Sequence, residues 1–228
     1  MPKPYTLVFL DADETLFDFR RAEEFALARS FEESGLTLTD RAAQEYERIN
    51  IDLWRRLEHG EIDQQSLRSE RFRLLFEVLG FTRDARGFGE TYVSWLARAS
   101  FLLDGAERLC AYLGARYRLA ILTNGIKEVQ YARIQSSPIN RYVEKLIVSE
   151  EAGCSKPDPA IFEYACAALE FRDRKRMIII GDSLSSDIRG GQNFGIDTCW
   201  YNPAKLPLAG EARPTYEVAS LEEIEGLL

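Results

Sequence analysis

The segment Met177-Ile178-Ile179-Ile180-Gly181-Asp182-Ser183 contains the strongest strand signal in the chain. Its first part is apolar without a polar break and rich in isoleucine, whose β-branched side chain favours extended backbone. A polar turn, Gly181–Ser183, follows at once. Short strands that are apolar on both faces are typical of parallel sheets covered by helices on both sides. The segment therefore predicts an α/β fold built on a parallel sheet.

Other parts of the chain repeat this pattern of an apolar strand followed by a turn and a helix. The further strands are predicted at Tyr5–Leu10, Arg118–Leu122, Lys145–Ser149, Thr198–Tyr201 and Tyr216–Val218. Helices are predicted to end near Gln135, Leu169 and Phe194, and a last helix begins at Leu221. We expect a Rossmann-like parallel sheet core with helices on both faces.

The alternation of strands and helices is interrupted early in the chain. Between about residues 18 and 100 the apolar residues recur at helical spacing only. The predicted faces are Tyr46, Asn50, Leu53 and Leu57; Leu67, Leu74, Leu75 and Val78; and Phe88, Tyr92, Trp95 and Ala99. Asp40 is placed to cap one helix, and glycines 35, 60 and 80 lie where helices should end.

This interruption predicts two domains. We expect residues 1–17 and 101–228 to form the sheet core, and residues 18–100 to form an all-helical bundle cap inserted after the first strand. Candidate hinges lie near Phe17-Asp18 and near Leu102–Gly105. Closure of such a cap would expel water and select the substrate.

Composition narrows the class of partner. The chain has 228 residues, 46% of them hydrophobic, which leaves ample material for a buried core. Its formal net charge of −8 argues against nucleic acid and anionic membranes as partners. No apolar stretch reaches the length of a membrane span, and the four cysteines have no metal-type spacing. We expect a cytoplasmic protein with reduced thiols.

Polar side chains collect where the predicted strands end. In open parallel sheets, ligands bind beyond the carboxyl ends of the strands, so these side chains should meet at one place. They are Asp11 and Asp13; Thr123 and Asn124; Lys156; and Asp182 and Asp187.

Phosphate-ester chemistry suits this set of side chains. Crowded carboxylates repel one another and need a cation, and an oxygen-only site favours Mg²⁺. A carboxylate can attack phosphorus as a nucleophile, which assigns Asp11 that role, and Asp13 can give the leaving group its proton. Thr123, Asn124 and Lys156 would bind the phosphoryl oxygens.

Each motif also has a purely structural interpretation. Asp11, Asp13 and Thr15 are common turn and cap residues, and Asp182-Ser183 could simply cap a helix. Lys156 alone would be an ordinary solvated lysine. The functional interpretation therefore depends on four such motifs falling at four strand ends. His59, the single histidine, is expected at a surface or interface rather than in catalysis.

The four motifs, Asp11–Thr15, Thr123–Gly125, Lys156–Asp158 and Gly181–Ser183 with Asp187, resemble in order those of the haloacid dehalogenase-like superfamily. The resemblance covers essentially the whole chain, and the helical insertion lies where that superfamily carries a cap. It implies that Asp11, the main-chain carbonyl of Asp13, and Asp182 hold Mg²⁺. It also implies that Asp187 lies behind the metal site and binds water or Lys156.

Asp13 argues against carbon–halogen cleavage, because the dehalogenases of this superfamily lack the second aspartate and need no Mg²⁺. The stretches Thr123–Arg133 and Leu53–Ile62 resemble bacterial nucleotidases that act on pyrimidine nucleoside monophosphates. In that resemblance, Gln130 and Arg133 are expected to support a helix structurally. A phosphatase for a small sugar or acid phosphate such as phosphoglycolate, a sugar phosphomutase and a non-hydrolytic binding protein remain alternatives, and the oligomeric state stays open.

Overall fold

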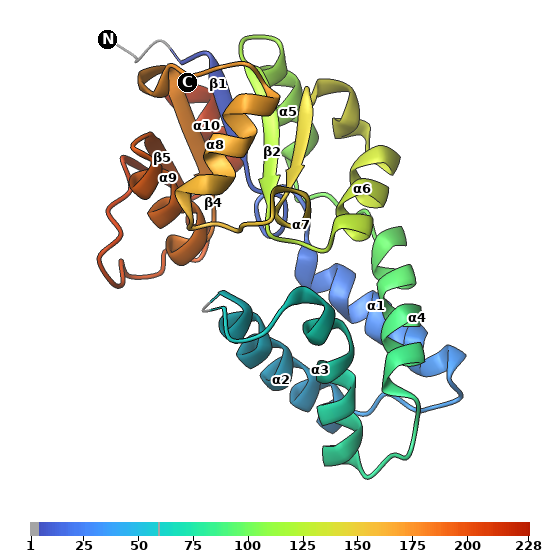
Figure 1. Cartoon of the computed structure of the whole chain (residues 1–228). Coiled ribbons are helices and arrows are strands. Elements are labelled where there is room, and N and C mark those ends of the chain that lie inside the picture. Colours follow the sequence, from blue (N-terminus) through green and yellow to red (C-terminus); the bar gives the residue numbers. More distant parts are fainter. Residues whose placement is uncertain (1–4, 59) are drawn as a thin grey trace. The chain divides into compact units, whose positions relative to one another are not determined.

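Residues 5–58 and 60–228 are described by the computed structural model, and the chain divides into two units. The first unit comprises Met1–Phe19 and Ser100–Leu228, and the second comprises Arg20–Ala99. Figure 1 shows the sheet of the first unit and the helices of the second. His59 lies outside the described residues.

One six-stranded sheet forms the centre of the first unit, and its paired strands are all parallel. The strand order is β3-β2-β1-β4-β5-β6. The strands are β1 (Leu7–Leu10), β2 (Arg118–Thr123), β3 (Lys145–Val148), β4 (Met177–Gly181), β5 (Asp197–Tyr201) and β6 (Tyr216–Val218). The predicted α/β fold with a parallel sheet is confirmed.

The register of the central strands aligns their carboxyl ends. Leu10 of β1 pairs with Ile121 of β2 on one side and with Ile180 of β4 on the other. The residues that follow these three positions therefore emerge at the same edge of the sheet. This alignment is what brings motifs far apart in the sequence to one place.

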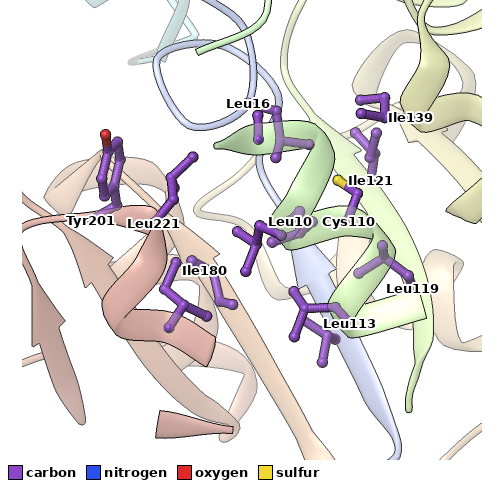
Figure 2. Packing of buried hydrophobic residues seen from close by; sticks show 14 of the residues in the cluster. Leu10, Leu16, Cys110, Leu113, Leu119, Ile121, Ile139, Ile180, Tyr201 and Leu221 are labelled. Carbon is purple, nitrogen blue, oxygen red and sulfur yellow. The ribbon is translucent and has the colours of Figure 1, made fainter. Parts of the chain in front are cut away.

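Successive residues of each strand face opposite sides of the sheet, so the alternation divides the core in two. Val8 and Leu10 face a cluster that includes Leu109 and Leu113 of α5 (Ala106–Gly114) and residues of α10 (Leu221–Leu227). Figure 2 shows side chains of this cluster, among them Leu10, Ile121 and Ile180. On the other face, Leu7 and Phe9 pack against α8 (Pro159–Ala168) and α9 (Arg189–Phe194). Helices thus cover both faces, as predicted.

The helices of the first unit differ from the prediction in two places. No element was predicted between Gly105 and Arg118, where the structure has α5. The helix predicted from Ser185 to Phe194 is divided into a π-helical turn, η3 (Leu184–Ile188), and α9. The remaining elements are α6 (Lys127–Ser136), the 3-10 helix η1 (Pro138–Tyr142), α7 (Ser149–Ala152) and the 3-10 helix η2 (Arg174–Arg176).

The second unit is helical throughout its described residues. It contains α2 (Asp40–Glu58), α3 (Gln64–Leu79), α4 (Ala85–Arg98) and all but the first residue of α1 (Phe19–Glu33). Aromatic rings fill its interior: Phe88 packs on Phe72 and Phe76 with ring centroids 4.9 and 5.0 Å apart. The predicted helical faces are largely buried, but Val78 is exposed and Phe72 and Phe76 take the interior positions.

Helix ends in this unit follow local chemistry. Gly80 ends α3 with a left-handed φ of 70°, and Asp84 caps α4 by accepting a hydrogen bond from the Arg86 amide. The predicted cap at Asp40 is displaced by one residue, because α2 begins at Asp40 and the amide of Ala42 donates to Thr39 Oγ1.

A buried polar network runs through the interior of the second unit. Glu23 accepts hydrogen bonds from the Tyr46 hydroxyl at 3.1 Å, from Asn50 Nδ2 at 2.8 Å and from the Tyr92 hydroxyl at 3.2 Å. Arg71 Nη1 donates to Asn50 Oδ1 at 3.2 Å. These bonds satisfy polar groups that would be costly to bury alone.

The two segments that lead toward the second unit are paired with each other. Asp18 N donates to the Phe101 carbonyl and Leu103 N donates to the Leu16 carbonyl, each at 2.9 Å. Phe17 and Leu102 form an isolated antiparallel bridge between these bonds. Both predicted hinge regions therefore belong to one short paired ladder.

Among the described residues, none of the helices combines the length and the apolar character that crossing a membrane requires. The cysteines at positions 110, 154, 166 and 199 are free thiols.

Candidate active site

Lys156 is the buried centre of the site at the carboxyl edge of the sheet. Its ammonium donates to Asp11 Oδ1 and, at 2.7 Å, to Asp187 Oδ1. Asp11 directly follows β1, Lys156 lies in the loop between α7 and α8, and Asp187 belongs to η3. Three separate segments thus supply one buried ion-pair cluster, and of the two partners expected for Asp187, water or Lys156, the structure shows Lys156.

Asp182 completes a group of carboxylates. Oxygens of Asp11, Asp182 and Asp187 lie within 4.8 Å of one another. The hydroxyl of Thr15 also contacts Asp182 Oδ1, at 3.3 Å. Three carboxylates facing one ammonium leave an excess of negative charge. That excess, and the exclusive use of oxygen donors, fit a hard divalent cation.

The pKa values of these groups reflect their burial first and the neighbouring charges second. Burial raises the pKa of Asp11 well above its ordinary value; Lys156 lowers it, while the other carboxylates raise it. Burial and then the charge of Asp187 raise the pKa of Asp182 to about 7. Burial disfavours the charged form of Lys156, but Asp11 and Asp187 outweigh it and raise the pKa of the ammonium. Each shift would relax if a cation joined the cluster.

Asp13 lies apart from this ion pair and has its own partners. Arg133 Nη2 donates to Asp13 Oδ1, and Gln130 Nε2 donates to Asp13 Oδ2 at 2.7 Å. Both donors come from α6. The two carboxylates predicted to act in catalysis are therefore held by different cations, Asp11 by Lys156 and Asp13 by Arg133.

Besides the structural role in a helix expected for them, Gln130 and Arg133 hold the side chain of Asp13. Their spacing of three residues, which places both on one helix face, was the available signal. The contact with Asp13 spans 117 and 120 residues of sequence, so no local pattern could reveal it.

The two polar side chains of the second motif, Thr123 and Asn124, form hydrogen bonds within the protein. Thr123 ends β2, and its hydroxyl oxygen accepts a hydrogen bond from the Gly125 amide at 3.0 Å. Asn124 makes a reciprocal pair with the main chain of Lys156: Nδ2 donates to the Lys156 carbonyl and Oδ1 accepts from the Lys156 amide, both at 2.9 Å. The side chain of Asn124 thus holds Lys156 in place.

Two glycines allow the side chains of Asp187 and Gln130 to lie close to the main chain. A Cβ on Gly181 would lie 2.2 Å from Asp187 Oδ2, and a Cβ on Gly125 would lie 2.0 Å from Gln130 Nε2. Real Cβ atoms do not tolerate such distances, so these positions require glycine for the observed packing. Asp187 Oδ2 also accepts a hydrogen bond from the Ser183 amide at 3.0 Å, which ties η3 to the end of β4.

The motifs, their order and the fold agree with a family comparison. The family model described as haloacid dehalogenase-like hydrolase matches residues 5–195. The chain belongs to this family. The predicted family, and the prediction that the chain is an enzyme of this hydrolase class, are confirmed.

Relatives match over nearly their whole length. The chain is 36% identical to the HAD-hydrolase YfnB of Bacillus subtilis, covering 99% of this chain and 96% of that protein. It is 36% identical to the pyrimidine 5'-nucleotidase PynA of Streptococcus pneumoniae, covering 96% and 93%. It is 34% identical to the pyrimidine 5'-nucleotidase YjjG of Escherichia coli K12, covering 97% and 96%.

A solved structure of YfnB shares the fold closely. The crystal structure of YfnB bound to magnesium, which reveals interdomain movement in that protein, superimposes with a TM-score of 0.93 at 36% identity. The match covers 99% of this chain and 99% of that one.

Proposed function

We propose that this chain is a magnesium-dependent phosphomonoesterase that acts through an aspartyl-phosphate on Asp11. The observation that carries the proposal is the buried cluster of Asp11, Lys156 and Asp187, which lies beside Asp182. Asp13 follows Asp11 by two residues, and its carboxylate is held by other side chains. This arrangement supplies a nucleophile, a fixed positive charge, a cation site and an independent proton carrier.

The described residues fit a magnesium ion. The carboxylates of Asp11 and Asp182, with the main-chain carbonyl of Asp13, would hold it, and Asp187 would stay with Lys156. When bound, the ion supplies positive charge that offsets the repulsion between Asp11 and an anionic phosphate. The binding of magnesium to YfnB, a relative that matches almost the whole chain, supports this assignment.

In the first half of the reaction, a carboxylate oxygen of Asp11 attacks phosphorus and the bond from phosphorus to the ester oxygen breaks. Asp13 donates a proton to the departing alkoxide. The ammonium of Lys156 and the hydroxyl of Thr123 stabilise charge on the phosphoryl oxygens. Asn124 keeps Lys156 in place through its main chain.

In the second half, water attacks phosphorus of the aspartyl-phosphate and Asp13 takes the water proton. The bond between Asp11 and phosphorus breaks, which releases inorganic phosphate and restores the carboxylate. One residue can serve both halves, because giving its proton to the leaving group leaves Asp13 as a carboxylate that can take a proton from water.

The proposed substrate is a pyrimidine nucleoside monophosphate. The support is the near full-length similarity to PynA and YjjG, which are named pyrimidine 5'-nucleotidases. We further propose that Arg20–Ala99 acts as a cap that selects the substrate, since YfnB shows interdomain movement. The free cysteines support action in the reducing cytoplasm.

A phosphate-release screen with purified protein tests the proposal. With Mg²⁺, the protein should hydrolyse UMP, dUMP and TMP faster than sugar phosphates or phosphoglycolate, and EDTA should stop the reaction. If the rates on the nucleotides are equal to or lower than those on the other phosphates, the proposed substrate class is wrong. The proposed phosphomonoesterase activity would still stand. Interconversion of sugar phosphates without net phosphate release would identify a mutase instead.

The variant Asp11→Asn tests the mechanism itself. It should remain folded, since the amide keeps the shape of the carboxylate, and lose activity by at least about 10³-fold because the nucleophile is gone. Unchanged turnover in this variant would rule out the aspartyl-phosphate route. Ligand binding without any turnover by the unaltered protein would indicate a binding module.

A further inference from the structure

We propose that Arg133 is a positioning residue that, together with Gln130, holds the carboxylate of Asp13 in the orientation needed for proton transfer. This inference rests on the proposed function, because it assigns Arg133 an action through the acid/base group. It adds to the four motifs a fifth functional element, located on α6.

The contacts form a closed set of three side chains. Each carboxylate oxygen of Asp13 has its own donor, Arg133 for Oδ1 and Gln130 for Oδ2. Arg133 Nη2 also donates to Gln130 Oε1 at 3.1 Å, which fixes the two donors relative to each other. The side chain of Asp13 is 22% exposed and that of Arg133 is fully buried. A partly exposed carboxylate is therefore tied to a rigid interior anchor.

Arg133 is itself held from several sides. Its guanidinium lies 4.8 Å from the ring centroid of Phe17 and 5.6 Å from that of Phe19, within range of a cation–π interaction. Its main-chain carbonyl accepts a hydrogen bond from the Ser100 hydroxyl at 3.0 Å. The two rings contact the guanidinium and the Ser100 bond holds the main chain of α6, so neither interaction depends on Asp13, as a positioning group requires.

The burial of this arginine is expensive for a purely structural residue. Nε and Nη1 are buried and have no hydrogen-bond partner among the described residues. Unpaired buried donors destabilise the folded state, and an apolar side chain of similar size would avoid that cost. The structural benefit alone does not account for an arginine here, whereas control of the Asp13 carboxylate does.

Loss of this control should slow both proton transfers of Asp13, the donation to the leaving group and the later acceptance from water, and kcat/KM registers only the first. An alkoxide needs that proton, whereas 4-nitrophenolate is a stable anion and leaves without one. The sensitivity of kcat/KM to the leaving group therefore reports on the positioning of Asp13, because kcat/KM includes steps only up to the departure of that group.

The test compares Arg133→Met, Gln130→Met and Arg133→Lys with the unaltered protein on an alkyl phosphate and on 4-nitrophenyl phosphate. In Arg133→Met, kcat/KM should fall by about 30- to 100-fold for the alkyl phosphate and by no more than about threefold for the aryl phosphate. Gln130→Met should show the same selectivity with a smaller loss. Arg133→Lys, which keeps a cation, should recover part of the alkyl phosphate activity.

A double variant separates positioning from a general structural effect. If Arg133 acts through Asp13, then adding Arg133→Met to Asp13→Asn should lower kcat/KM by no more than about twofold further. Equal losses on both substrates in every Arg133 and Gln130 variant, or additive losses in the double variant, would overturn the inference. Thermal midpoints confirm that the variants fold. If the unaltered protein hydrolyses neither phosphate, the proposed function fails instead.

Discussion

Lys156 and Asp187 form an ion pair at 2.7 Å in which both side chains are about 1% exposed. Asp187 is in turn fastened to the end of β4 by the Ser183 amide, and Lys156 also reaches Asp11. This pair therefore connects the loop before α8, the π-helical turn and the strand that precedes Asp11. Stability and activity should both depend on it.

Replacing Asp187 with Asn should weaken this connection. Lys156 would keep Asp11 but lose a second buried carboxylate, so we expect the free energy of unfolding to fall by about 1–3 kcal/mol. We also expect kcat/KM for phosphate esters to fall, because the ammonium is less firmly placed. Urea unfolding and steady-state kinetics measure the two effects.

The matched control is Glu144→Gln, which breaks the exposed pair of Arg118 and Glu144. Exposed pairs contribute little, so its stability should stay within about 0.5 kcal/mol of the original. If both variants lose the same stability, the Lys156–Asp187 pair has no special role in the fold.

The substitution Gly181→Ala should displace Asp187. The added Cβ would lie within 2.7 Å of three atoms of that side chain, two of which belong to its carboxyl group. We expect a loss of activity of at least about tenfold with a lower thermal midpoint, because η3 must shift to relieve the clash. Gly226→Ala is the control: nothing lies within 4 Å of its Cβ and Gly226 is in α10, so alanine should be neutral or slightly stabilising. Full activity in Gly181→Ala would contradict the observed packing of Asp187.

The stability of the metal-free protein should depend on pH through Asp182. Burial and the charge of Asp187 raise its folded-state pKa to about 7, above the value of about 3.9 in an unfolded chain. The resulting stabilisation is fully present below about pH 4 and is lost as pH rises through about 7. In EDTA we expect a lower thermal midpoint at about pH 8 than at about pH 6.

Magnesium provides the complementary measurement. Because protons compete with the cation for the carboxylates, added Mg²⁺ should raise the midpoint more at the higher pH. Asp182→Asn should reduce the pH dependence between these values and remove most of the response to Mg²⁺, while Asp11, whose pKa is also raised, keeps part of the pH dependence. A thermal midpoint that does not change when Mg²⁺ is added at the higher pH would argue against a cation at this cluster.

The polar network of the helical unit makes a separate prediction about stability. In Tyr92→Phe, Glu23 and Tyr46 each lose a hydrogen-bond partner, so the free energy of unfolding should fall by about 1–2 kcal/mol. Tyr164→Phe is the control. Tyr164 is exposed, so in the original protein its hydroxyl can be hydrated in both the folded and the unfolded state. Equal stability in Tyr92→Phe and Tyr164→Phe would show that the buried hydroxyl contributes nothing.

Much of the fold could be predicted because its signals are local. Apolar runs such as Met177–Ile180 indicate buried parallel strands, and the break in strand signal between about residues 18 and 100 indicates the helical unit. The helix α5 was missed although Leu109 and Leu113 have helical spacing and are buried. Val78 was misplaced because helical spacing alone does not show which of two neighbouring apolar faces packs inward.

The sequence by itself determined the parallel sheet, the order of the polar turns and therefore the edge at which Asp11, Lys156, Asp182 and Asp187 gather. Each of these follows from residues adjacent in the chain, since a strand dictates where its own turn emerges. Only the tertiary structure decided which cation holds which of the two catalytic carboxylates: Lys156 pairs with Asp11, and Arg133 pairs with Asp13. The pairings of Asp11 with Lys156 and of Asp13 with Arg133 depend on how segments separated by more than 100 residues pack against the sheet, and no local pattern encodes such distances.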